Sequence, residues 1–183
     1  MREELEITAY HEAAHAVAAW FCGIQVTEVS VERDKNRLGY TQFSYTAEQN
    51  AAKARDDPSL LLPLILIGLA GMAGDHAHWK WTQPIPPNEA LVGDYMDQEQ
   101  VLDRLRRIGY DKPTDFDACL GTATRLFSRD DVWAVVDKLA QALMKHKKLN
   151  GKQLDVFAAA TPRVNADFWD FMERGIEYFR QGG

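Results

Sequence analysis

Apolar residues recur at helical spacing over most of this chain. They predict a first helix from Glu3 to Cys22, and Gly23 is placed to end it. The almost wholly apolar stretch from Leu60 to about His78 predicts a buried helix. Amphipathic spacing predicts further helices at residues 94–108, 116–127, 128–147 and 165–180.

Two shorter segments alternate apolar and polar residues instead. Val26–Glu32 is rich in β-branched residues and Leu38–Tyr45 in aromatic ones, so we expect two strands joined by a turn at residues 34–37. The predicted fold class is therefore α+β and mainly α-helical, with a small β-sheet near the N-terminus followed by a helical bundle.

Composition narrows the class of protein further. The chain has 183 residues, of which 46% are hydrophobic and 26% charged, as in ordinary globular proteins. The net charge of −6 argues against a nucleic-acid partner. Two cysteines are too few for a disulfide framework. Residues 1–6 are charged and resemble no secretory signal, and Leu60–Ala73 is too short for a membrane span, so we expect a cytoplasmic protein.

The most informative motif lies in the first predicted helix. Residues 11–15 read His-Glu-Ala-Ala-His and match the H-E-x-x-H pattern of zinc hydrolases. His11 and His15 are four positions apart, which places both imidazoles on one helix face, where they can bind a single zinc ion. Glu12 follows the first histidine and is positioned to act as the general base.

A catalytic zinc site needs at least one further protein ligand. Chemistry and spacing leave the choice open, with Asp94 favoured, His76 next, and a wider set of candidates comprising Asp75, His78 and Asp97. Leu38, Gly39, Tyr40 and Thr41 begin the second predicted strand. If that strand forms a sheet edge near the zinc, it can bind substrate as an added strand.

Five segments together resemble one protein family. They are residues 8–17 (TAYHEAAHAV), 38–41 (LGYT), 69–76 (LAGMAGDH), 93–95 (GDY) and 149–154 (LNGKQL). In sequence and order they are similar to the peptidase domain of the FtsH-type ATP-dependent zinc metalloproteases. The resemblance spans roughly residues 3–154.

The resemblance implies a zincin-like helix and a set of site residues. His11, His15 and Asp94 would bind one Zn²⁺ per chain, with Glu12 as catalytic base. Asp75 and His76 match acidic positions of the family, and one of them would orient a ligand imidazole. We thus expect an FtsH-like zinc peptidase domain at residues 1–154, with residues 155–183 forming a helical extension packed on the same domain.

Three departures from the family bear on function. Ala14 replaces a glycine of the zinc helix, and Met72 replaces an arginine. The chain also contains no G-x-x-x-x-G-K-[ST] loop, so the family's ATPase motor is not encoded in it.

The expected function is that of an ATP-independent metalloendopeptidase acting on unfolded or small polypeptides. Two alternatives remain open at this point. One is a peptidase subunit that needs a separate ATPase or adaptor, and the other is a catalytically lapsed zinc-binding domain with a regulatory role. A homo-oligomer is also compatible with the sequence.

Overall fold

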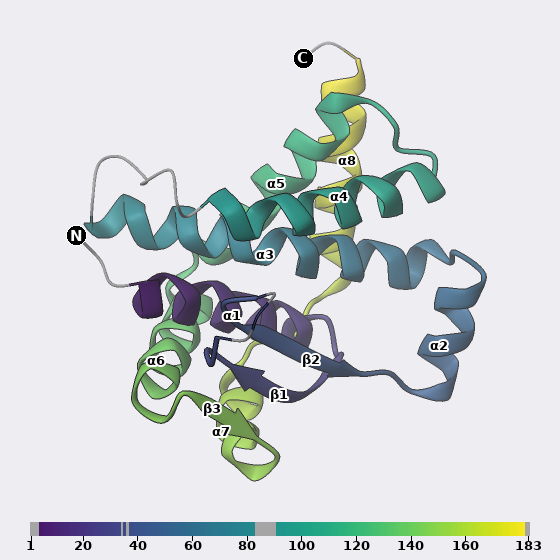
Figure 1. Ribbon diagram of the computed structural model, residues 1–183. Coiled ribbons are helices and arrows are strands. Elements are labelled where there is room, and N and C mark those ends of the chain that lie inside the picture. Colours follow the sequence, from purple (N-terminus) through teal and green to yellow (C-terminus); the bar gives the residue numbers. More distant parts are fainter. Residues whose placement is uncertain (1–3, 34, 36, 83–90, 182–183) are drawn as a thin grey trace.

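Helix α1 (Glu4–Phe21) lies at the centre of the protein and is buried along most of its length (Figure 1). The computed structural model describes residues 4–33, 35, 37–82 and 91–181, without the side chains of 79–82, 91–96, 166, 179 and 180. It is 72% helical with a small antiparallel sheet, which confirms the prediction of a mainly α-helical α+β protein.

The end of α1 follows the expected glycine-capped pattern. Gly23 has a φ of +75°, a conformation that a residue without a β-carbon adopts readily. The Gly23 amide donates to the Trp20 carbonyl, and the Ile24 amide donates to the Ala19 carbonyl. These two bonds form a Schellman motif, which turns the chain from the helix into the first strand.

The sheet of the described residues has three antiparallel strands. Strand β1 (Gln25–Ser30) lies between β2 (Tyr40–Ser44) and β3 (Lys148–Asn150), so β2 is an edge strand. The sequence predicted the β1–β2 hairpin but missed β3, whose three residues are too short to show a period.

Two long helices cover α1 on the side away from β3 (Figure 1). After α2 (Ala47–Ala54), which the sequence analysis missed, come α3 (Pro58–Thr82) and α4 (Leu91–Arg107). By length and composition alone, residues 58–78 of α3 could cross a membrane, but 89% of the critical window is buried inside the protein. This supports the prediction that the segment is a buried core helix.

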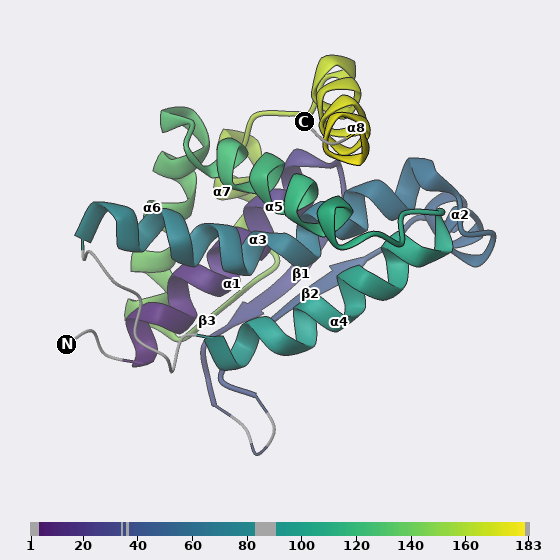
Figure 2. The same cartoon turned by 90° about the horizontal axis from the view of Figure 1, so that it is seen from above.

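The remaining helices complete a bundle around α1 and α3. They are α5 (Pro113–Phe127), α6 (Asp130–His146), α7 (Lys152–Ala160) and α8 (Ala166–Arg180). The proposed boundary between residues 154 and 155 falls inside α7. Met172 and Ile176 of α8 are buried in the same hydrophobic core as α1, and α8 packs against α5 (Figures 1 and 2).

Candidate metal centre

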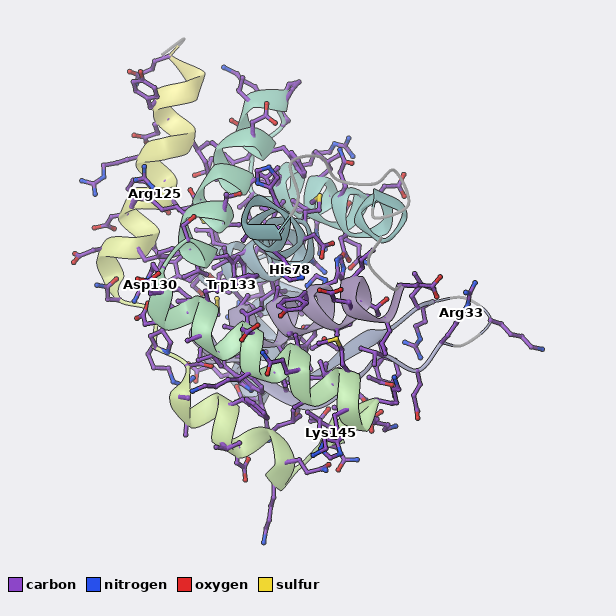
Figure 3. All side chains as sticks on the ribbon, turned by 90° about the vertical axis from the view of Figure 1, so that its left-hand side faces the viewer. Arg33, His78, Arg125, Asp130, Trp133 and Lys145 are labelled. Atoms are coloured by element: carbon purple, nitrogen blue, oxygen red, sulfur yellow. The ribbon has the colours of Figure 1, made fainter. Side chains whose placement is uncertain are left out.

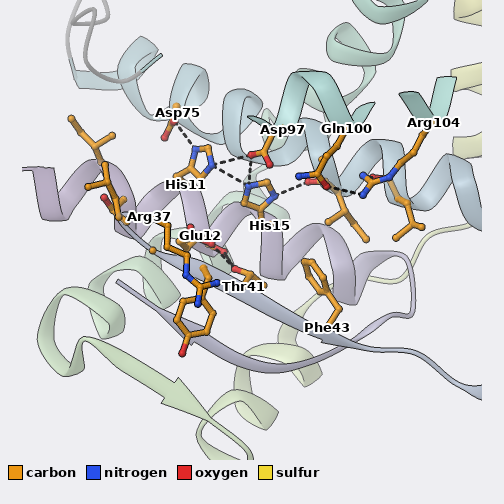
Figure 4. A pocket seen from close by; sticks show the side chains of 18 of the residues that line it. His11, Glu12, His15, Arg37, Thr41, Phe43, Asp75, Asp97, Gln100 and Arg104 are labelled. Carbon is orange, nitrogen blue, oxygen red and sulfur yellow. Dashed lines mark hydrogen bonds and ion pairs between the residues drawn. The ribbon is translucent and has the colours of Figure 1, made fainter. Parts of the chain in front are cut away.

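Two imidazoles of α1 meet a carboxylate of α4 at one point. His11 Nε2 lies 3.1 Å from His15 Nε2 and 3.3 Å from the Oδ2 atom of Asp97. His15 Nε2 lies 3.1 Å from the same carboxylate oxygen (Figure 4). Asp97 is thus the acidic candidate whose described side chain contacts both histidines.

The dimensions of this triangle suit a tetrahedral metal ion. Two ligand atoms that are each about 2.0–2.1 Å from a tetrahedral zinc lie about 3.3 Å apart. The three separations in the protein are 3.1, 3.1 and 3.3 Å. Two imidazole nitrogens and one carboxylate oxygen are also a ligand set that zinc prefers, and a three-residue set leaves a coordination position open.

Asp94, the residue favoured from the sequence, lies on α4 one turn before Asp97. Its side chain is outside the described part of the structure, so its role as a ligand stays a prediction. The two aspartates are three positions apart, which places both positions on the same side of the helix.

The other ring nitrogens of the two histidines have acceptors of their own. His11 Nδ1 lies 2.9 Å from Asp75 Oδ2, and His15 Nδ1 lies 2.7 Å from the backbone carbonyl of Ile67. A carboxylate and a carbonyl both accept hydrogen bonds, so in each neutral imidazole the proton belongs on Nδ1. Both Nε2 atoms then direct lone pairs toward the Asp97 carboxylate, an arrangement that a cation stabilises.

Without a metal, the positive charge between the two histidines and Asp97 would have to come from protons on the imidazoles. Burial lowers the pKa of His11, but the charge and hydrogen bond of Asp75, with Asp97, outweigh it and leave the pKa well above its usual value. His15 shows the same balance, with Asp97 raising its pKa against burial. Burial would raise the pKa of Asp97, yet its bonds to the two histidines hold it well below its usual range.

Glu12 is buried beside this triangle and is held by the edge strand. The Thr41 hydroxyl of β2 donates to Glu12 Oε2 at 2.8 Å and lies 3.1 Å from the Glu12 backbone carbonyl. The carboxylate lines the same cavity as His11 and His15. Thr41 therefore fixes one of the two carboxylate oxygens of Glu12.

A cavity of about 590 Å³ extends from the histidines between α1, α3, α4 and β2. All four residues predicted to bind substrate, Leu38 to Thr41, line it. Because β2 is one of the two outer strands of the described sheet, a sheet edge does lie next to the histidine pair.

Two histidine candidates lie away from the triangle. His76 is exposed on α3. His78 stacks on the Tyr10 ring, with 3.5 Å between ring centroids, and its Nε2 lies 3.1 Å from a Glu6 carboxylate oxygen. Trp133 lies beside the same pair of rings (Figure 3). Of the pair Asp75 and His76, Asp75 makes the contact to a ligand imidazole.

Glycines on α3 make room for α1. A β-carbon at Gly71 would overlap the His11 ring, and one at Gly74 would lie 2.5 Å from the β-carbon of Ala14. The additional methyl group of Ala14 relative to the FtsH-type motif is therefore accommodated by Gly74 on the facing helix.

Gln100 and Arg104 are among the polar cavity residues that sequence reasoning missed. They follow Asp97 by three and seven positions, so the spacing of one helix face could have linked them to that aspartate. Comparison of the chain with protein-family models gives no match, and comparison with curated proteins gives none either. The similarity to FtsH-type peptidases thus rests on the residues quoted above.

Proposed function

We propose that this protein is a zinc-dependent endopeptidase that hydrolyses peptide bonds in unfolded or small polypeptides. The observation that supports this most strongly is the triangle of His11 Nε2, His15 Nε2 and Asp97 Oδ2, with separations of 3.1–3.3 Å. The placement of Glu12 beside it supports a catalytic site, because a purely structural zinc site needs no base.

In this proposal each residue has a defined task. His11, His15 and Asp97 would hold the ion, and Asp75 and the Ile67 carbonyl keep the two rings oriented. A zinc ion held by these residues would supply a lowered pKa for a coordinated water and polarisation of the scissile carbonyl. Glu12 takes a proton on its carboxylate during attack and delivers it to the departing amide nitrogen. The hydrogen bond from Thr41 keeps that carboxylate directed toward the cavity.

The form of the substrate follows from the edge strand. Strand β2 lines the cavity and is an edge strand of the described sheet, and an extended peptide can bind to such an edge as an added strand. Backbone pairing requires that the substrate be locally unfolded. Stably folded domains should therefore resist cleavage unless a separate ATPase or adaptor unfolds them.

The first test combines metal analysis with a base variant. We expect about one zinc per chain in the purified protein, and we expect Glu12→Gln to retain zinc while losing cleavage of unfolded polypeptide by a factor of at least about 10². Full activity in Glu12→Gln would contradict the mechanism. Bound zinc without cleavage of any unfolded substrate would instead favour the binding or regulatory alternative.

The third ligand is tested by a matched pair of variants on α4. Asp97→Ala should weaken zinc affinity by at least about tenfold, since it removes one of three protein ligands. Asp94→Ala is the comparison, and zinc affinity is measured by competition with a chelator of known strength. Loss of zinc in Asp94→Ala alone would return the ligand role to Asp94.

A further inference from the structure

Arg104 lies at the far end of the cavity from Glu12. It follows Asp97 by seven residues on α4, or about 10 Å along the helix axis. Figure 4 shows Asp97, Gln100 and Arg104 in a row along α4, with the guanidinium turned back toward Gln100. All three residues line the cavity.

The guanidinium is held by neutral groups. One of its terminal nitrogens donates to the Leu64 carbonyl at 2.9 Å, and the other donates to Gln100 Oε1 at 3.0 Å. Among the described residues, no carboxylate lies within ion-pair distance of Arg104. A guanidinium has five N–H donors, so these two bonds leave three donors without a described partner. A half-buried cation with neutral partners is a favourable place for an incoming anion.

The two walls of the cavity lead from Glu12 toward this cation. Thr41 on β2 contacts Glu12, while Phe43 and Tyr45 lie farther along the same wall. Tyr45, Asp97 and Asp103 all act on Arg104 electrostatically, although neither carboxylate forms an ion pair with it among the described residues. In Figure 2, β2 and α4 both run toward α2. A peptide paired with β2 would therefore extend from the histidines toward Arg104.

We propose that Arg104 binds a carboxylate of the substrate within about three residues of the bond that is cleaved. This rests on the proposed peptidase function. Three residues is the upper limit, since positions 97 and 104 are about 10 Å apart along the helix, the guanidinium turns back toward Gln100, and an extended peptide rises about 3.3 Å per residue. The chain-terminal carboxylate is one source of this anion, and the side chain of an acidic residue is the other. The protein would then prefer sites close to a C-terminus or close to an Asp or Glu.

The test uses three fluorescent peptides of one sequence. The first ends in a free carboxylate, the second ends in an amide, and the third ends in an amide with glutamate as its last residue. Dissociation constants are measured by fluorescence anisotropy on zinc-loaded Glu12→Gln protein, which keeps the peptides intact. We expect the first peptide to bind about 10- to 100-fold more tightly than the second, as for a charge-assisted hydrogen-bonded pair. Tight binding of the third peptide would assign the anion to an acidic side chain as well.

Two arginines of α4 provide the matched variants, made in the same background. Arg104→Met keeps much of the apolar stem but removes the charge, and it should abolish the preference for the carboxylate peptide. Arg104→Lys should restore part of it. Arg106→Met, an exposed change two residues away and outside the cavity, should leave the preference unaltered. In active protein, the carboxylate preference should appear mainly in KM and much less in kcat.

Three results would overturn the proposal: equal binding of all three peptides to the parent protein, a preference that survives Arg104→Met, or a preference lost equally in Arg106→Met. Circular dichroism establishes that each variant is folded. If Arg104→Met is unfolded, the comparison of the three peptides on the parent protein still decides. Because binding is measured without turnover, a failure of the peptidase proposal shows as absent cleavage, whereas a failure of this one shows as absent carboxylate preference.

Discussion

At the scale of single residues, the ring nitrogens that do not face Asp97 define the site as much as those that do. The hydrogen bond from His11 Nδ1 to Asp75 is made between a ring and a carboxylate that are both largely buried. It fixes both the tautomer and the orientation of the ring, and it makes Nε2 a stronger ligand. Asp75 is therefore expected to matter for metal binding without touching the metal.

This expectation can be measured with Asp75→Asn. The amide nearly preserves the shape of the side chain but removes the negative charge, so zinc affinity should fall about 10- to 100-fold. Chelator competition provides the measurement. His76→Ala is the control, since His76 is the exposed neighbour and should leave zinc affinity unchanged. The opposite pattern would assign the orienting role to His76.

At the scale of elements, α1 and α3 approach closely because small residues face one another. The contact between Ala14 and Gly74 is the clearest case, since a second β-carbon there would have no room. One of the two positions can carry a methyl group, and this chain carries it on α1. The facing positions should therefore be energetically coupled.

We predict that Gly74→Ala lowers the free energy of unfolding by about 1–3 kcal/mol through overpacking. The double variant Ala14→Gly/Gly74→Ala moves the methyl group to α3 and should be more stable than the sum of the two single changes indicates. Urea denaturation of the parent protein, the two single variants and the double variant completes the double-mutant cycle. Gly121→Ala on α5 is the control, because its β-carbon would meet nothing within 4 Å and should stabilise the helix. Strict additivity at positions 14 and 74 would refute the coupling.

The elements also show which part of the site the sequence could predict. His11 and His15 are related by one helix turn, so their convergence followed from spacing alone. Asp97 is 82 residues from His15, and its approach depends on how α3 and α4 pack, which no local pattern encodes. The sequence therefore offered several candidates for the third ligand without a means of choosing.

The elements that were not predicted from the sequence were missed for different reasons. Helix α2 begins with a capping box in which Thr46 and Gln49 bond each other's backbone amides, a signal that was present in the sequence. Strand β3 has three residues and exists because Leu149 pairs with Val29 in the sheet, so only tertiary structure could reveal it. Helix α7 was not predicted either. It directly follows β3, and residue 154, where the family resemblance ends, lies inside it.

At the scale of the whole molecule, a metal ion would join α1 to α4 across the cavity and should stabilise the folded chain. The metal-free protein obtains a similar link from protons, because the pKa values of His11 and His15 are raised in the folded state. A raised pKa contributes stability that is fully present below the unfolded value of about 6.5 and is lost as the pH rises through the folded value. Zinc requires neutral imidazoles, so its contribution changes with pH in the opposite direction.

The increase in melting temperature caused by zinc should therefore grow from pH 6 to pH 8. With a fixed zinc concentration of about 100 times the dissociation constant at pH 8, the gain in stability at that pH is about 2.7 kcal/mol, which corresponds to roughly 5–10 °C for a domain of this size. Thermal unfolding with and without zinc at each pH measures it. His15→Ala, which removes a ligand, should show little zinc effect at either pH. A zinc effect in the parent protein that is independent of pH would mean that the ion binds somewhere other than the two imidazoles.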